Sequence, residues 1–154
     1  MQKQLTKDKA LSRAMRYCAY QDRANKEVVL KLKTWGVNDQ DSLFIINYLK
    51  EEGYLNEERF SRAFISGKFR LKKWGRIKIR FELKAKGIST ELISLCLEEI
   101  SDIEYKKCIY KLANEKMQTT KGKDAYVIRN KVANYLLRKG YESELIWEAI
   151  NLFK

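Results

Sequence analysis

The chain repeats itself around three glycines, Gly36, Gly87 and Gly140, which lie 51 and 53 residues apart. Apolar residues recur four positions before, eight positions before and one position after each glycine. In the order of the repeats they are Leu32, Leu83 and Leu136; Val28, Ile79 and Val132; and Val37, Ile88 and Tyr141. Glycine after an apolar helical stripe is a typical helix stop, because glycine takes the left-handed conformation. A period of about fifty residues with matching stops predicts a tandem repeat array.

The second and third repeats also agree beyond their glycines, where Leu97 and Ile150 each follow ten positions later. Each repeat carries helical patterns for three helices. We therefore predict an all-α fold, an elongated and curved tandem array of three three-helix repeats, with boundaries at 1–53, 54–100 and 101–154. A unit of this size buries little apolar surface alone, so we expect neighbouring repeats to pack on one another.

The middle repeat has the clearest helix signals. Asn56 is placed to cap its first helix, and the two glutamates that follow complement the helix dipole. The expected apolar stripe of that helix is Phe60, Ala63, Phe64, Gly67 and Leu71; the expected stripe of the third helix of repeat one is Leu43, Ile46 and Leu49. The stretch 76–81 alternates apolar and basic residues as a strand does, but the equivalent stretches of the other repeats have a helical pattern, so we predict a helix.

Composition excludes several classes of protein. The chain has no proline, as expected of a mostly helical protein, and no window of 18 consecutive apolar residues that would span a membrane. The N-terminal stretch lacks the apolar core of a signal peptide, so we expect a cytoplasmic protein. Three widely separated cysteines without any histidine predict neither a disulfide scaffold nor a metal site.

Catalytic residues are scarce. The chain lacks histidine, the commonest general base, and has neither a P-loop nor a GxGxxG fingerprint. Its paired glutamates stand at helix ends, where solvation explains them. We predict that the protein is not an enzyme and carries no cofactor.

The formal net charge is +12, which suggests a polyanion or an acidic protein surface as partner. Between Lys68 and Lys86 nine basic residues face a single acid, Glu82. Arg76, Arg80 and Lys84, spaced by four, form a predicted basic row. The predicted contact residues are Lys68, Arg70, Lys72, Lys73, Trp74, Arg76, Lys78, Arg80, Lys84 and Lys86 in repeat two, and Arg129, Lys131, Arg138 and Lys139 in repeat three.

Other interpretations of these residues stay open at this level. The basic face is also compatible with a solvated surface that binds nothing. Most aromatic residues lie on apolar stripes and are expected in the core. Trp74 stands at a turn between Lys73 and Gly75, so either an exposed stacking position or a packed one fits it.

The middle repeat resembles the RecX regulatory proteins. The residues that carry the resemblance are Gly53-Tyr-Leu-Asn-Glu-Glu-Arg-Phe60, Gly75, Ile79, Glu82-Leu83 and Lys86-Gly87-Ile88. The first repeat is similar through Ala10-Leu11, Tyr17, Glu27, Lys31-Leu32 and Gly36, and the last through Tyr135-Leu136-Leu137-Arg138-Lys139-Gly140-Tyr141. The first repeat departs from the family pattern at Ala24-Asn25-Lys26, where serine and acid residues are usual.

The resemblance implies tandem three-helix repeats and a role in DNA repair and recombination. It also implies binding to the RecA–DNA filament, with restraint of strand exchange, ATP hydrolysis and co-protease activity. We expect a monomer that binds RecA and DNA and does not bind a membrane. Two alternatives remain: a basic helical module that binds nucleic acid without RecA, and a scaffold of stacked helices for an unrelated protein.

Overall fold

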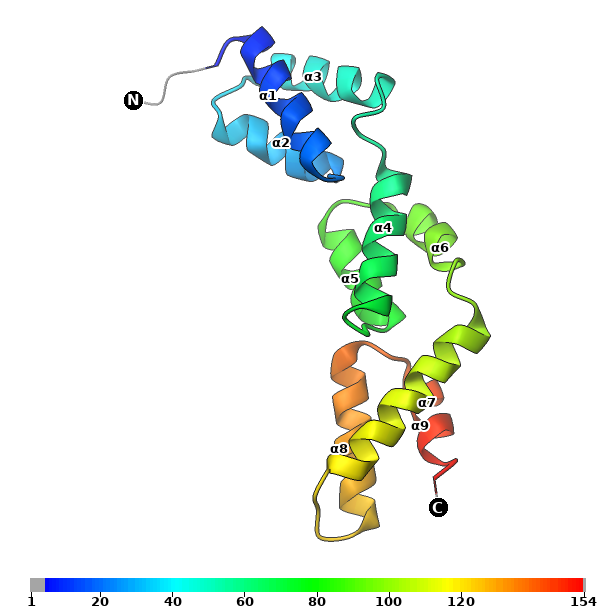
Figure 1. The fold of residues 1–154 in the computed structure, drawn as a ribbon. Coiled ribbons are helices and arrows are strands. Elements are labelled where there is room, and N and C mark those ends of the chain that lie inside the picture. The colour runs from blue at the N-terminus through cyan, green and yellow to red at the C-terminus, as the bar shows by residue number, and fades with distance from the viewer. Residues whose placement is uncertain (1–4, 154) are drawn as a thin grey trace. The chain divides into compact units, whose positions relative to one another are not determined.

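The computed structural model describes residues 5–153, and within that range every regular element is a helix (Figure 1). The predicted all-α class is confirmed, including a helix at 76–81. In chain order the helices are α1 (Lys7–Tyr20), α2 (Asn25–Thr34), α3 (Asp39–Glu51), α4 (Glu57–Arg70), α5 (Arg76–Ala85), α6 (Thr90–Leu97), α7 (Asp102–Thr119), α8 (Ala125–Lys139) and α9 (Ser143–Ile150).

The described chain forms two compact units. Unit 1 holds the residues up to Ala63 together with Leu83–Leu92, and unit 2 holds Phe64–Glu82 together with the residues from Ile93 onward. Helices α4, α5 and α6 each contribute to both. The three repeat boundaries drawn from the sequence stay a prediction.

In unit 1, helices α1, α2 and α3 pack around one apolar cluster. Ala10 and Ala14 of α1, Leu32 of α2, and Ile45 and Leu49 of α3 are all fully buried there. Small alanines on α1 let the three helices approach closely, as a core at native density requires.

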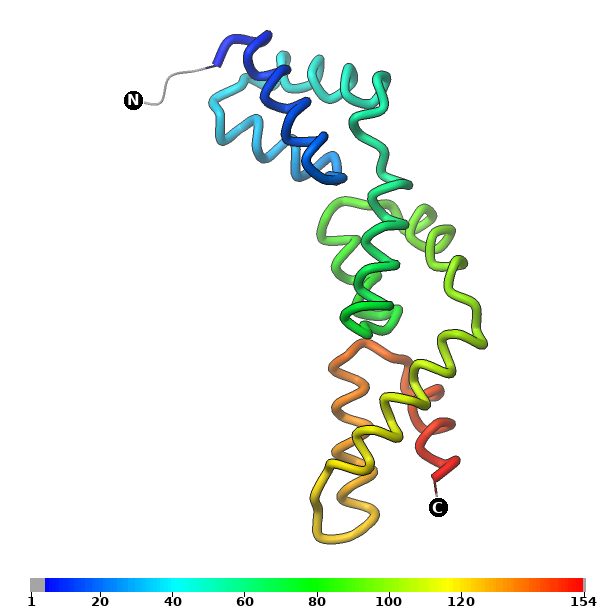
Figure 2. The backbone as a smooth tube through the Cα atoms, viewed as in Figure 1, coloured from blue at the N-terminus to red at the C-terminus, as the bar shows by residue number. Residues whose placement is uncertain are grey.

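In unit 2, helices α7, α8 and α9 pack on one another, and α8 returns alongside α7 after the turn that joins them (Figure 2). Tyr105 and Ile109 of α7, Leu136 of α8 and Ile146 of α9 are buried in this core, together with Tyr141 from the turn between α8 and α9. Two tyrosines in a core need partners for their hydroxyl groups, and these partners prove to organise the candidate site.

The repeat predicted from the three glycines is present in the structure. Gly36, Gly87 and Gly140 all have positive φ, at 77°, 83° and 98°. In each repeat the backbone N–H of the residue after the glycine donates to the carbonyl of the leucine four positions before the glycine, at 2.9, 3.1 and 3.2 Å. This is the Schellman bond that ends helices, and it recurs at all three sites. The apolar residues four and eight positions before each glycine are fully buried.

Two predicted stripes were partly wrong. On α3, Leu43 is 64% exposed and Ile45 is buried instead. On α4, Ala63 is exposed and Leu71 lies beyond the helix, while Ile65 and Phe69 fill the core. Ile46 and Leu49 of α3 and Phe60 of α4 are buried as predicted, so each error concerns only part of a stripe. The errors occur because these helices offer apolar residues on more than one face. The predicted cap is correct: Asn56 accepts a hydrogen bond from the N–H of Arg59 at 2.9 Å.

Candidate interaction surface

A close backbone contact in unit 2 joins the turn after α4 to the turn after α8. The N–H of Gly75 donates to the carbonyl of Lys139 at 2.8 Å, and the N–H of Ile77 donates to the carbonyl of Gly140 at 3.0 Å. A Cβ at Gly75 would lie 2.3 Å from the Gly140 carbonyl oxygen. Only glycine at position 75 allows this approach. We call this contact the glycine joint.

Side chains brace the same turn. Lys73 has a φ of 59°, an unusual value for a residue other than glycine. Its carbonyl accepts a hydrogen bond from the Tyr141 hydroxyl at 2.7 Å, and the Lys72 carbonyl accepts one from Nζ of Lys139 at 2.9 Å. Burial raises the pKa of Tyr141, so its phenol stays protonated and able to donate. The turn is thus held in one conformation by residues of repeat three.

Trp74 is half-buried at the edge of this turn and packs edge-on against Phe64, with ring centroids 6.4 Å apart. The ammonium groups of Lys68 and Lys78 lie 4.7 and 4.3 Å from the centre of the Trp74 ring. Both distances are within the range of cation–π attraction. Trp74 therefore positions two cations and is neither fully exposed nor fully buried.

Lys139 lies among like charges. Burial lowers the pKa of its amine, and the positive charges of Lys78, Lys72 and Lys73 lower it further, while Cys108 acts in the opposite direction. A group of cations that repel one another stores an unfavourable energy that an anionic partner relieves. We call Lys68, Lys72, Lys73, Lys78 and Lys139 the lysine cluster.

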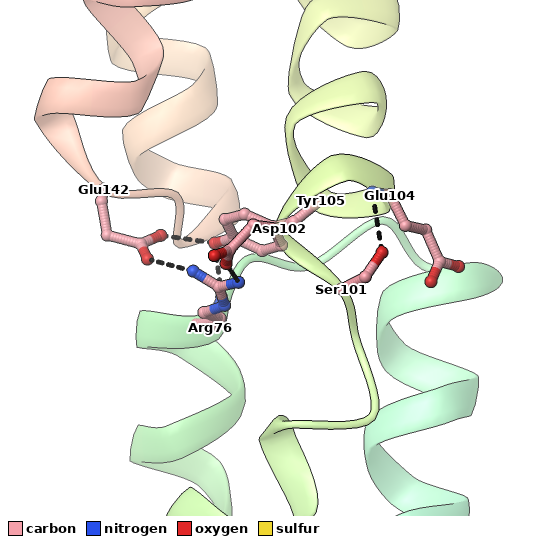
Figure 3. Close-up of polar contacts among 6 residues, drawn as sticks. All are labelled: Arg76, Ser101, Asp102, Glu104, Tyr105 and Glu142. Atoms are coloured by element: carbon pink, nitrogen blue, oxygen red, sulfur yellow. Dashed lines mark hydrogen bonds and ion pairs between the residues drawn. The ribbon is translucent and has the colours of Figure 1, made fainter.

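Arg76 does not belong to the lysine cluster. Its guanidinium pairs with Asp102 at 2.9 Å and Glu142 at 3.4 Å, and it lies 3.8 Å from the centre of the Tyr105 ring (Figure 3). The Arg76 side chain is only 22% exposed. The structure thus uses Arg76 to fix α5 onto the start of α7 and the start of α9, and not as a member of an exposed row.

Tyr105 completes this network from the core. Its hydroxyl accepts a hydrogen bond from the N–H of Arg76 at 2.9 Å and donates one to the Glu142 carboxylate. Burial and the bond to Glu142 raise the pKa of Tyr105. In the same view the hydroxyl of Ser101 accepts a hydrogen bond from the N–H of Glu104 and caps α7 (Figure 3).

The other predicted contact residues are placed unevenly. Lys84 and Lys86 belong to unit 1, where Lys84 is exposed and Lys86 lies 4.0 Å from Glu27. The rest belong to unit 2. There Arg70 pairs with Glu104, and Arg80 donates a hydrogen bond to Ser94. Arg129 and Lys131 donate to the backbone carbonyls of Phe153 and Lys121, and Arg138 is exposed.

Residues 5–153 contain no group of three or more cysteine, aspartate or glutamate side chains suited to a metal ion.

Two apolar residues of α5 were missed at the sequence level. Ile77 is 55% exposed and Phe81 is 71% exposed. They are four residues apart, so they share one face of the helix. The signal was present in the alternating stretch 76–81, whose apolar residues fall on two faces: Ile79 is in the core and the other two are outside.

Comparison with models of known protein families shows which family the chain belongs to. Residues 56–97 match the family model of the RecX second three-helix domain, and residues 104–150 match that of the RecX third three-helix domain. Together the two matches cover more than half of the chain. The chain belongs to the RecX family.

Similarity to individual RecX proteins extends over most of the chain. It is 29% identical to the regulatory protein RecX of Prosthecochloris aestuarii, over 93% of this chain and 92% of that protein. It is 33% identical to the regulatory protein RecX of Lactobacillus johnsonii, over 88% of this chain but only 50% of that protein. The chain therefore spans about half the length of some of its relatives.

Solved structures agree on the fold. The crystal structure of RecX from Lactobacillus salivarius covers 95% of each chain with a TM-score of 0.87 and 23% identity. RecX proteins are named regulatory proteins, and membership in the family supports a regulatory role here. No helix within the described residues has the length and apolarity that crossing a membrane requires.

Proposed function

We propose that this protein binds RecA–DNA filaments and restrains their strand exchange, ATP hydrolysis and co-protease activity. The resemblance to RecX suggests RecA as the partner. The exposed residues of α5 and the lysine cluster supply the chemistry for a mixed protein and nucleic-acid target.

The observation that carries the proposal is the exposed pair Ile77 and Phe81. A partner that offered only phosphates would gain nothing from two large apolar side chains on one helix face. A protein surface would bury both, and apolar patches that stay exposed commonly mark such contacts. At about 25 cal/mol per Å² of apolar surface removed from water, two side chains of this size contribute on the order of a few kcal/mol.

The lysine cluster would act beside this face as the contact to negative charge. Lys68 and Lys78 are positioned by Trp74, and Lys139 is positioned by the Lys72 carbonyl. Cations that are already held in place lose little side-chain entropy when they meet an anion. We expect them to contribute an attraction that weakens as salt is added.

The test compares two pairs of substitutions in a RecA assay on single-stranded DNA. The double variant Ile77→Ser/Phe81→Ser should lose most of the inhibition of ATP turnover that the unsubstituted protein causes. The matched control is Ile103→Ser, which removes an apolar side chain that is 70% exposed on α7 of the same unit. The control should inhibit as well as the unsubstituted protein.

Two results would contradict the proposal. One is an absence of inhibition by the unsubstituted protein at amounts stoichiometric with RecA. The other is full inhibition by Ile77→Ser/Phe81→Ser, which would separate the α5 face from RecA binding.

A second candidate function is nucleic-acid binding that needs no RecA, and the lysine cluster favours it. The two functions differ in affinity for naked DNA. Tight binding to DNA alone, falling steeply with salt and unaffected by Ile77→Ser/Phe81→Ser, would support the second function.

A further inference from the structure

A polar hollow in unit 2 lies between the end of α7 and one face of α8. Its volume is about 400 Å³, which is within the range of small-molecule sites. Four cations line it: Lys116 and Lys121 from the α7 side, and Lys131 and Arg138 from α8. Among the described residues that line this hollow, none is acidic.

The cations are partly fixed before any ligand arrives. Nζ of Lys131 donates to the Lys121 carbonyl at 2.9 Å. Nζ of Lys116 lies 4.4 Å from the centre of the Tyr135 ring. An ammonium group has three donors, so a single hydrogen bond to a carbonyl leaves Lys131 able to bind an anion as well.

Neutral polar groups complete the lining. Thr120 and Asn134, whose side chains carry a hydroxyl and an amide, also line the hollow. Of the nearby acids, Asp124 caps α8 by accepting a hydrogen bond from the N–H of Val127 at 2.9 Å, and Glu115 lines a different hollow beside Phe69. The site therefore combines cations with neutral hydrogen-bonding groups, the combination that oxyanions require.

The α7 helix dipole accounts for only part of this arrangement. Lys116 and Lys121 stand at its negative end, where cations are favourable without any ligand. The dipole of α7 does not explain the residues that α8 contributes to the hollow. These are Lys131, Asn134 and Arg138, whose spacing places them on one face of α8. Lys131 and Arg138 are separated by about 10 Å along the axis, at 1.5 Å per residue. A ligand that meets both must carry more than one negative group.

We propose that this hollow is a binding site for phosphate groups of a nucleotide or a nucleic-acid strand. The proposal does not depend on RecA, because it concerns the protein alone. Free polyphosphates and strands share the chemistry, and separate probes distinguish them.

The test is a titration of the full ¹⁵N-labelled chain with inorganic pyrophosphate and, separately, with a thymidine tetranucleotide at low salt. Either probe should shift the backbone amide signals of Thr120 and Lys121 in the NMR spectrum. The variant Lys131→Gln/Arg138→Gln should bind about tenfold more weakly or worse, because two charge-assisted contacts are lost. Equal affinity for both probes assigns the site to free phosphates, and tighter tetranucleotide binding assigns it to strands.

The matched control is Lys33→Gln/Lys50→Gln, which removes two exposed charges from unit 1 and should change affinity less than about twofold. Lys121→Gln, in the turn between helices, tests the same hollow without disturbing a helix. An equal loss in the control, or unshifted signals at Thr120 and Lys121, would overturn the proposal.

Discussion

The N–H of Gly75 donates to the carbonyl of Lys139 at 2.8 Å, which ties the turn after α4 to the end of α8 across 64 residues of chain. The backbones meet so closely that a single Cβ at position 75 would overlap the Gly140 carbonyl. Lys72 and Lys73 lie in the same turn, so the glycine joint also sets the positions of the lysine cluster.

Gly75→Ala should therefore destabilise the protein by more than about 3 kcal/mol, because the new methyl group meets backbone that cannot move aside. Urea unfolding followed by circular dichroism measures the change. Gly67→Ala is the matched control. A Cβ at Gly67 in α4 meets nothing within 4 Å, so alanine should stabilise the helix by about 0.5–1 kcal/mol. Changes of the same sign in both variants would contradict the account of the joint.

Arg76 and Arg80 should behave differently although both stand on α5. Arg76→Gln removes two ion pairs and a cation–π contact from a mostly buried guanidinium, and we expect a loss of about 2 kcal/mol in the free energy of unfolding. Arg80→Gln removes one hydrogen bond to Ser94 and should cost less than about 1 kcal/mol. If Arg76→Gln unfolds at the same urea concentration as the unsubstituted protein, the network of Figure 3 is not a stabilising element.

Lys139 should give the folding stability a distinctive pH dependence. Its pKa is lowered in the folded state, so between that value and the ordinary lysine pKa of about 10.4 the unfolded chain binds more protons. Its cost to stability is therefore full at neutral pH and fades as pH rises through this window. Relative to Lys139→Gln, the unsubstituted protein should gain stability as the pH rises toward the ordinary lysine pKa.

This comparison needs the variant because the buried phenols act in the other direction. The pKa values of Tyr105 and Tyr141 are raised, so stability falls once the unfolded phenols ionise above about pH 10. That loss is shared by both proteins and cancels in the difference. A constant difference between pH 7 and pH 10 would show that Lys139 is not under electrostatic strain.

Much of the fold was predictable from the sequence because its signals are local. Gly36, Gly87 and Gly140 stop their helices as expected, and the residues at fixed offsets from them form the core. Leu43 of α3 shows the limit: Leu43 and Ile45 are both apolar and stand two residues apart, so only the packing partner decides which one is buried.

The candidate site was less predictable because its contacts are distant in sequence. Arg76 is paired with Asp102 and Glu142, which lie 26 and 66 residues away. No local pattern distinguishes such an arginine from Arg80. The exposure of Ile77 and Phe81 could not be predicted either, because it depends on which side of α5 faces the core.

The central claim, that the α5 face contacts a RecA filament, is tested most directly by binding. The measurement is the fluorescence anisotropy of the labelled chain titrated with RecA filaments on single-stranded DNA and with the same DNA alone. The account predicts tighter binding to the filament than to the DNA, and loss of that preference in Ile77→Ser/Phe81→Ser but not in Ile103→Ser. Equal affinity for the filament and the naked DNA would contradict it.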